Sequence, residues 1–214
     1  MPLPEPSLLV VTDRRLADRP LPETADCLFA SGLRWLSLRD KDLPDAERLE
    51  LARALMARAR PWDACVTLHG DPALAAAAGA DGVHLPSGGD PAAARALLGR
   101  DALIGLSVHD SDGGAAMERA GGQVDYVTLS PVFPSASKPG YGPCLGTARL
   151  RHWAGRGVPV IALGGIDRAG AGAECRAAGA AGGAVMGLAM RDPQALAPLL
   201  AALGPAGNAA QRCG

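Results

Sequence analysis

The sequence predicts an α/β fold of one kind, a single (βα)8 or TIM barrel. Its 214 residues fit one domain near the lower end of the usual size range of this fold. Short runs rich in Val, Leu and Ile alternate with longer Ala-rich stretches, which is the pattern of repeated βα units. Three similar segments, AGADGVH, AGGQVDYV and AGAAGGAV, each pass from an expected helix end into an expected strand. We therefore expect one barrel domain over residues 1–214, with a core from about residue 8 to residue 203.

Eight short apolar runs are the expected strands, and helices are expected in most of the gaps between them. The helix after the second strand is the clearest, because Leu43-Pro44-Asp45 opens it and apolar residues follow at roughly helical spacing. Gly79, Gly121 and Gly179 are expected to end helices. The expected strands are Leu8–Thr12, Trp35–Arg39, Cys65–His69, Gly82–Leu85, Leu103–Ser107, Tyr126–Ser130, Val158–Leu163 and Gly182–Met186.

Composition excludes several classes of protein. Lys and Arg total 21 against 22 Asp and Glu, so no broad basic field is available to attract nucleic acid. The five cysteines are an odd number without CxxC spacing, which favours reduced thiols over disulfides. The opening residues lack a basic segment followed by an apolar one, and their apolar stretch is far shorter than a membrane span. We expect a cytoplasmic protein without nucleic-acid or membrane partners.

The site of a (βα)8 barrel is built where its strands end, so residues at those positions are the first candidates. Arg39 and Lys41 stand two residues apart at the end of the second strand, and together they suit a diphosphate or a carboxylate. The alternative is a solvated charge cluster in which Asp40 and Asp42 form local pairs. The position at a strand end favours the anion site.

Two further segments have the residues of a phosphate site. The stretch Leu129–Pro143 combines stiffening prolines with Ser135, Ser137 and Lys138, whose donors could converge on an anion, although a stiff surface loop is the alternative. Gly164 and Gly165 end the seventh strand and Gly187 follows the eighth, where backbone N–H groups can hold a phosphate.

The four histidines show no spacing typical of a zinc site. His69 ends the third strand, where it could face the cavity as an acid or base or pack between strands, and both interpretations stay open. His84, His109 and His152 are expected to be packing or surface residues.

Seven motifs follow one another along the chain. They are VVTD (10–13), LRDKDL (38–43), GADGVHL (79–85), GLSVHD (105–110), DYVTLSPVFPSASK (125–138), ALGGI (162–166) and AVMG (184–187). With these motifs the chain, from about Leu9 to Leu203, resembles the family that contains thiamine phosphate synthase and thiazole tautomerase. The resemblance implies that Ser135, Ser137, Gly165, Met186 and Gly187 hold a thiazole phosphate. It also implies that Arg39, Lys41, Ser107 and Lys138 face the pyrimidine diphosphate in synthases.

Departures from the family pattern affect the expected reaction. The synthases usually carry Gln where Ser37 stands, Asn-Asp where His69-Gly70 stand, and a second Asp where Gly89 stands. In that family the two aspartates bind magnesium, so the glycines predict that no magnesium binds there. His84–Ser87, HLPS, is similar to the tautomerase branch, but the tautomerase compared has a histidine where Pro131 stands.

The first expectation is therefore a tautomerase-like enzyme of thiamine biosynthesis that needs no cofactor, with His69 or Lys138 as the acid or base. The alternatives are a synthase that takes magnesium through other ligands, and a non-catalytic protein that binds a thiazole phosphate. The expected partner is a small phosphorylated thiazole, and a homodimer is one assembly that the sequence allows. The expected substrate-binding residues are Ser37, Arg39, Lys41, Ser107, Ser135, Ser137, Lys138, Gly164, Gly165, Met186 and Gly187.

Overall fold

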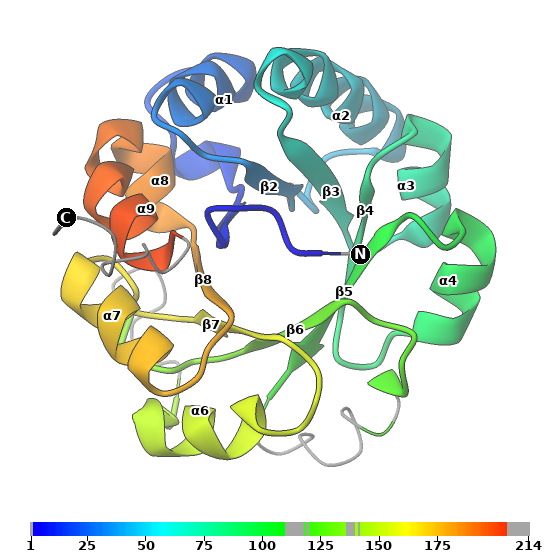
Figure 1. Ribbon diagram of the computed structural model, residues 1–214. Helices are drawn as coiled ribbons and strands as arrows, with labels where there is room; N and C mark the ends of the chain where they lie inside the picture. Colours follow the sequence, from blue (N-terminus) through cyan, green and yellow to red (C-terminus); the bar gives the residue numbers. More distant parts are fainter. Residues whose placement is uncertain (1, 110–117, 119, 136–139, 141, 205–214) are drawn as a thin grey trace, which may run out of the picture.

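The computed structural model describes residues 2–109, 118, 120–135, 140 and 142–204. Eight parallel strands close into a barrel in chain order, with β8 paired to β1 (Figure 1). The predicted (βα)8 barrel is confirmed, and each strand ends within one residue of its predicted end. The strands are β1 (Leu8–Val11), β2 (Trp35–Leu38), β3 (Cys65–His69), β4 (Gly82–Leu85), β5 (Leu103–Val108), β6 (Tyr126–Leu129), β7 (Val160–Leu163) and β8 (Gly182–Val185).

Helices surround the barrel (Figure 1). They are α1 (Leu21–Ala30), α2 (Asp45–Ala59), α3 (Pro72–Ala78), α4 (Pro91–Leu98), α6 (Gly146–Ala154), α7 (Ala169–Ala177), α8 (Gly187–Arg191) and α9 (Ala197–Leu203). Short 3-10 helices lie at Arg14–Leu16, Arg60–Trp62 and Pro193–Leu196.

Local sequence signals fix several helix ends. Asp71 caps α3 by accepting from the N–H groups of Ala73 and Leu74, and Pro72 then starts the helix without needing a backbone donor. Gly79 ends α3 in the left-handed region with φ 70°, as predicted. Gly179, with φ 92°, lies one residue beyond the cap of α7. Gly121 has φ 37° and follows a segment that is only partly described.

Successive side chains along each strand point alternately into the barrel and outward to the helices, and they form two separate hydrophobic cores. In β2, Leu36 and Leu38 point outward into the layer between barrel and helices, whereas Trp35 points into the barrel. The inner core consists of Leu9, Val11, Trp35, Leu103, Tyr126, Ile161 and Ala184. These side chains fill the inside of the barrel away from the carboxyl ends of the strands, so a cavity has room only nearer those carboxyl ends.

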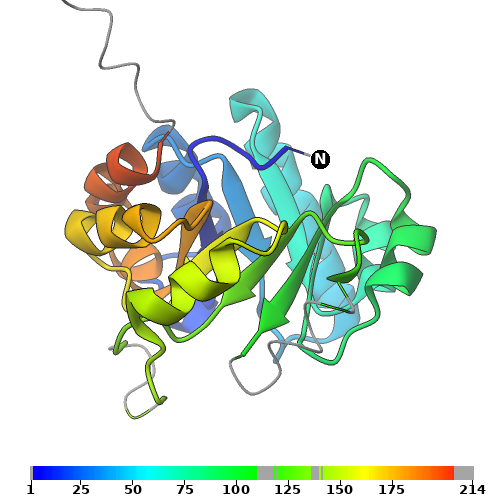
Figure 2. The same cartoon turned by 60° about the horizontal axis from the view of Figure 1, so that its bottom comes forward.

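The two ends of the barrel differ. Leu3 of the N-terminal segment packs against the inner core, and in Figure 1 this segment crosses the barrel opening. Figure 2 shows that the segment lies at the end opposite to the strand arrowheads. The carboxyl ends of the strands are therefore the end at which a ligand can enter. None of the helices in the described ranges has the length and apolar character that a bilayer crossing requires.

Candidate functional site

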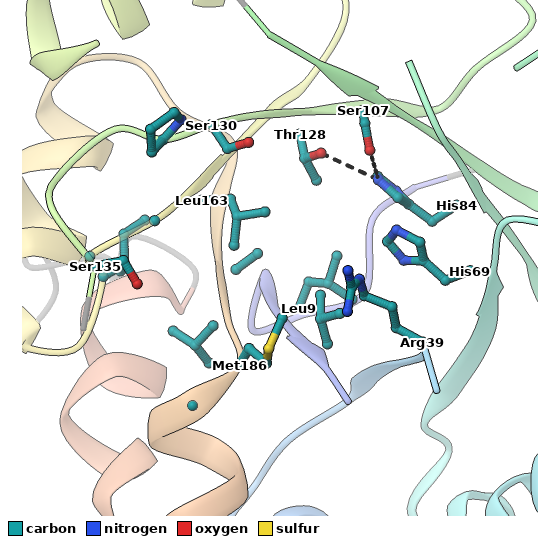
Figure 3. Close-up of a pocket in the computed structure, with 18 of the residues that line it drawn as sticks. Leu9, Arg39, His69, His84, Ser107, Thr128, Ser130, Ser135, Leu163 and Met186 are labelled. Carbon is teal, nitrogen blue, oxygen red and sulfur yellow. Dashed lines mark hydrogen bonds between the residues drawn. The ribbon is translucent and has the colours of Figure 1, made fainter. Parts of the chain in front are cut away.

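A cavity of about 450 Å³ opens at the carboxyl ends of the strands (Figure 3). It brings together residues predicted from strand ends that are far apart in sequence. Ser137 and Lys138 lie outside the described residues. The predicted residues that line the cavity are Arg39, Lys41, His69, Ser107, Ser135, Gly164, Gly165, Met186 and Gly187.

Ser37 is the exception among the predicted contacts. It lies on β2 and is completely buried, but it does not line the cavity. Arg39 follows two residues later, nearer the strand end, and its longer side chain reaches the cavity. The contact of Ser37 with substrate therefore stays a prediction, one that the lining of the cavity does not support.

A buried carboxylate organises the loops after β1 and β2. The Thr12 hydroxyl donates to Asp40 at 2.6 Å and accepts the backbone N–H of Arg39 at 2.9 Å. Asp40 also accepts the backbone N–H of Arg14 at 2.8 Å, and its side chain has no exposed surface. These bonds connect the end of β1 to the residue that enters the cavity.

The acidic residues Asp40 and Asp42 pair with an arginine from the loop after β1. The Arg14 guanidinium contacts Asp40 at 3.3 Å and Asp42 at 2.8 Å. Its hydrogen bond lowers the pKa of Asp42 to about 2, and both carboxylates raise the pKa of Arg14. Asp40 and Asp42 therefore pair with Arg14, across the rim, while Arg39 and Lys41 line the cavity.

His84 is the main functional candidate that the sequence interpretation missed. It is 2% exposed and lines the cavity, with Nδ1 2.9 Å from the Tyr126 hydroxyl and Nε2 3.0 Å from Ser107 Oγ (Figure 3). Thr128 Oγ1 lies 3.3 Å from the same Nε2. Burial, assisted by the positive charge of Lys41, lowers the pKa of His84 to about 3. The signal was available in β4, where outward Val83 and Leu85 place His84 inward.

His69 faces the cavity beside His84. The centroids of the two rings lie 4.6 Å apart, and Figure 3 shows His69 beside Arg39. Of the two positions left open for His69, the structure shows the cavity-facing one. Its role as an acid or base stays a prediction.

The opposite side of the cavity is formed by the turns after β7 and β8. Gly164 and Gly165 have φ values of 99° and 66°, in the region that favours glycine. A Cβ on Gly165 would lie 2.4 Å from the Pro134 carbonyl oxygen and 2.7 Å from Phe133 Cβ. Glycine therefore lets the loop after β6 lie against the turn after β7, and this contact carries Ser135 to the cavity.

Gly187 begins α8 directly after Met186, and both line the cavity. The N–H groups in the first turn of a helix have no partner within the helix, so they can donate to an anion. Arg191, the last residue of α8, also lines the cavity and adds a positive charge that the sequence interpretation overlooked. In Figure 3, Ser135 and Met186 lie on the side opposite to Arg39 and His69.

The residues present do not fit the magnesium site that the resemblance implies. Gly70 and Gly89 offer no side-chain oxygen, and a Cβ on Gly89 would lie 2.9 Å from Leu85 Cβ. The adjacent Asp71 and Asp90 cap α3 and α4 by accepting backbone N–H groups. Within the described ranges, no three His, Cys, Asp or Glu side chains are grouped as a metal site would require. We assign no step to magnesium.

Comparisons with known proteins agree with the resemblance. The family described as "Thiamine monophosphate synthase" matches residues 8–188. A putative thiamine-phosphate synthase of Geobacter sulfurreducens is 43% identical over 190 residues, covering 87% of this chain and 88% of the relative. A thiamine-phosphate synthase of Azorhizobium caulinodans is 41% identical over 166 residues, covering 75% of this chain and 76% of the relative.

A solved structure extends the likeness to the fold. Thiamine phosphate pyrophosphorylase from Pyrococcus furiosus superposes with a TM-score of 0.77 at 27% identity, covering 92% of this chain and 94% of that one. The names of the relatives favour a synthase over the tautomerase-like enzyme that we expected first.

Proposed function

The chain belongs to the thiamine monophosphate synthase family of thiamine biosynthesis, and from this premise we propose that it is an enzyme joining a pyrimidine diphosphate to a thiazole phosphate. The names of the relatives support the synthase activity. The observation that carries the proposal is the arrangement of the cavity, which has anion-binding groups on two opposite sides. A reaction between two phosphorylated substrates needs both of these anion-binding sides.

Each side has groups suited to one substrate. Gly165, Gly187 and Ser135 would hold the phosphate of the thiazole through backbone and hydroxyl donors. Arg39 and Lys41 would bind the diphosphate, since a guanidinium and an ammonium neutralise its charge. Holding the two substrates in one cavity turns an encounter in solution into a reaction between neighbours.

The bond changes define what the side chains must stabilise. In the joining reaction the thiazole nitrogen forms a bond to the exocyclic methylene carbon of the pyrimidine. The bond between that carbon and the diphosphate oxygen breaks, and its electron pair leaves with the diphosphate. Negative charge therefore grows on the leaving group, where Arg39 and Lys41 would stabilise it. The absence of carboxylates at Gly70 and Gly89 places this task on side-chain cations.

A tautomerase is the second candidate, and a specific observation favours it. Gly70 and Gly89 lack the family's carboxylates, while His69 faces the cavity. A histidine with a reference pKa near 6.5 can take and return a proton at neutral pH, as an isomerisation between ring and exocyclic carbons requires. Lys138, the other candidate for this role, lies outside the described residues.

An assay of the purified chain separates these functions. The protein is incubated with the pyrimidine diphosphate and the thiazole phosphate, then with the carboxythiazole phosphate alone, each with and without magnesium. We expect thiamine phosphate and pyrophosphate, measured by chromatography, and Arg39→Ala as a control that loses most of the product. Isomerised carboxythiazole phosphate without any joined product would contradict the synthase and support the tautomerase. Tight binding without either product would show a binding protein and overturn both.

A further inference from the structure

The cavity floor contains two buried side chains to which neither proposed reaction gives a role, His84 and Tyr126. Both are inside the barrel, and Tyr126 has no exposed surface. His84 lies between Tyr126 on one side and Ser107 and Thr128 on the other, with a ring nitrogen facing each. Of these four residues, His84, Ser107 and Thr128 line the cavity, and Tyr126 lies behind His84.

The hydrogen bonds select one form of His84. The Tyr126 hydroxyl is buried, and within the described part of the chain its hydrogen-bond partner is His84 Nδ1. A buried phenol proton needs an acceptor, so Tyr126 donates and Nδ1 accepts. A neutral imidazole carries one proton, which must then be on Nε2. Nε2–H consequently donates toward Ser107, the nearer hydroxyl oxygen at 3.0 Å, with Thr128 at 3.3 Å.

Neighbouring residues pack closely around the hydrogen bond between Tyr126 and His84. A Cβ on Gly105 would lie 2.4 Å from the Tyr126 hydroxyl and 2.6 Å from His84 Nδ1, so glycine makes room for the bond between them. The Trp35 ring packs edge-on against Tyr126 with centroids 4.7 Å apart. The Tyr126 hydroxyl is thus held against Nδ1 from several sides.

We infer that His84 is a positioning residue, locked with its proton on Nε2, which makes Ser107 a hydrogen-bond donor toward the substrate. Because Ser107 accepts from His84, its own O–H is directed to another partner, and Ser107 lines the cavity. The O–H suits a substrate group that accepts a hydrogen bond, such as a diphosphate or carboxylate oxygen. The substrate part of this inference rests on the proposed function.

The tautomer can be tested without any substrate. In the full chain labelled with ¹⁵N-histidine, two-bond proton–nitrogen correlations show which ring nitrogen of His84 carries the proton. We expect Nε2–H, unchanged between about pH 5 and pH 8, the range in which an ordinary histidine titrates. In Tyr126→Phe, Nδ1 loses its donor and both tautomers should appear. An Nδ1–H tautomer in the parent, or titration near the ordinary value, would overturn the inference whatever the enzyme does.

The consequence for Ser107 is tested by binding inorganic pyrophosphate. We expect Ser107→Ala and His84→Asn each to weaken binding about tenfold, as loss of one charge-assisted hydrogen bond predicts. Their double variant should lose no more than either one, because the two residues act through one bond. His84→Gln, whose amide can place an N–H near the Nε2 position, should recover part of the affinity. His152→Asn, an exposed histidine on α6, is the control.

The outcomes remain separable from those of the proposed function. Additive losses, or a His84→Asn variant that folds and binds like the parent, would overturn the role of His84. If the parent itself binds no pyrophosphate, the diphosphate side of the proposed function fails, while the tautomer measurement still decides the state of His84. If His84→Asn does not fold, Tyr126→Phe provides the same comparison with a smaller change of shape.

Discussion

The two sides of the cavity are built from different groups. On the β7 and β8 side, glycine turns bring the backbone to the cavity, and their conformations and packing leave no space for a side chain at Gly165. On the β2 to β4 side, the side chains of Arg39, Lys41 and His69 form the wall. The first side depends on the course of the chain and the second on residue identity. Substitution can therefore change the chemistry of the second side while the phosphate site stays in place.

Two departures that the resemblance implies lie on the side of the side-chain wall. Gly70 and Gly89 follow β3 and β4 where the resemblance implies carboxylates in synthases, whereas Gly165 and Gly187 belong to motifs that carry the resemblance. The difference between the sides can be tested by variants that should affect one substrate and spare the other.

The largest effect is expected for Arg39→Ala. Affinity for the pyrimidine diphosphate should fall about a hundredfold, because charge-assisted hydrogen bonds contribute about 1.5 to 3 kcal/mol each. Affinity for the thiazole phosphate should stay unchanged, since the site proposed for that ligand is the backbone on the other side. Calorimetric titration measures both, with Arg58→Ala on α2 as the control. Equal losses for both ligands would show that the two sides are not independent.

Gly187→Val should have the opposite selectivity. A branched side chain at the start of α8 would stand between the backbone and the phosphate, so thiazole-phosphate affinity should fall at least about tenfold, roughly 1.4 kcal/mol. Diphosphate affinity should be retained. Gly155→Val is the matched control, because that glycine caps α6 at φ −80° with nothing within 4 Å of an added Cβ. A folded Gly187→Val protein with parent affinity would refute the phosphate placement.

The buried histidine predicts a pH dependence of stability. Burial lowers the pKa of His84 to about 3 from 6.5, so between these values the unfolded chain binds the proton that the folded chain does not. The free energy of unfolding should decrease as pH falls from about 6.5 toward 3, by at most about 1.4 kcal/mol per pH unit. Urea unfolding at a series of pH values measures it. His84→Gln should flatten this part of the profile, and an identical profile in that variant would exclude His84 as the cause.

The smallest effect is expected for His69→Asn in the joining assay. The resemblance places Asn at this position in synthases, so thiamine phosphate should form at near the parent rate. A tautomerase that uses His69 as its proton carrier would instead lose about a hundredfold in isomerisation. A large loss of joined product would show that His69 takes part in the joining reaction and would contradict this prediction.

The fold was predictable because its signals are local. Short apolar runs, proline or aspartate at helix starts and Gly79 at a helix end each report a backbone conformation. Positions at strand ends likewise placed Arg39 and Gly165 at the cavity. Depth within the barrel was not predictable in the same way, because spacing does not show where a side chain ends.

Ser37 and His84 show this limit in opposite directions. Ser37 is the third of the four residues of β2, and its short side chain stays buried. His84 is likewise the third of the four residues of β4, yet its longer side chain reaches the cavity and connects Tyr126 to Ser107. The partners of His84 come from β5 and β6, so the pairing and register of three neighbouring strands bring them together.

The proposed reaction requires that the cavity bind two anionic substrates at once, one on each side. The most direct measurement is a calorimetric titration of the pyrimidine diphosphate into protein already saturated with thiazole phosphate, over times too short for turnover or with a non-reacting diphosphate analogue. We expect one equivalent of diphosphate to bind with an affinity similar to that for the empty protein, and no release of the thiazole phosphate. Displacement of the thiazole phosphate as the diphosphate binds would show a single shared anion site and would contradict the claim.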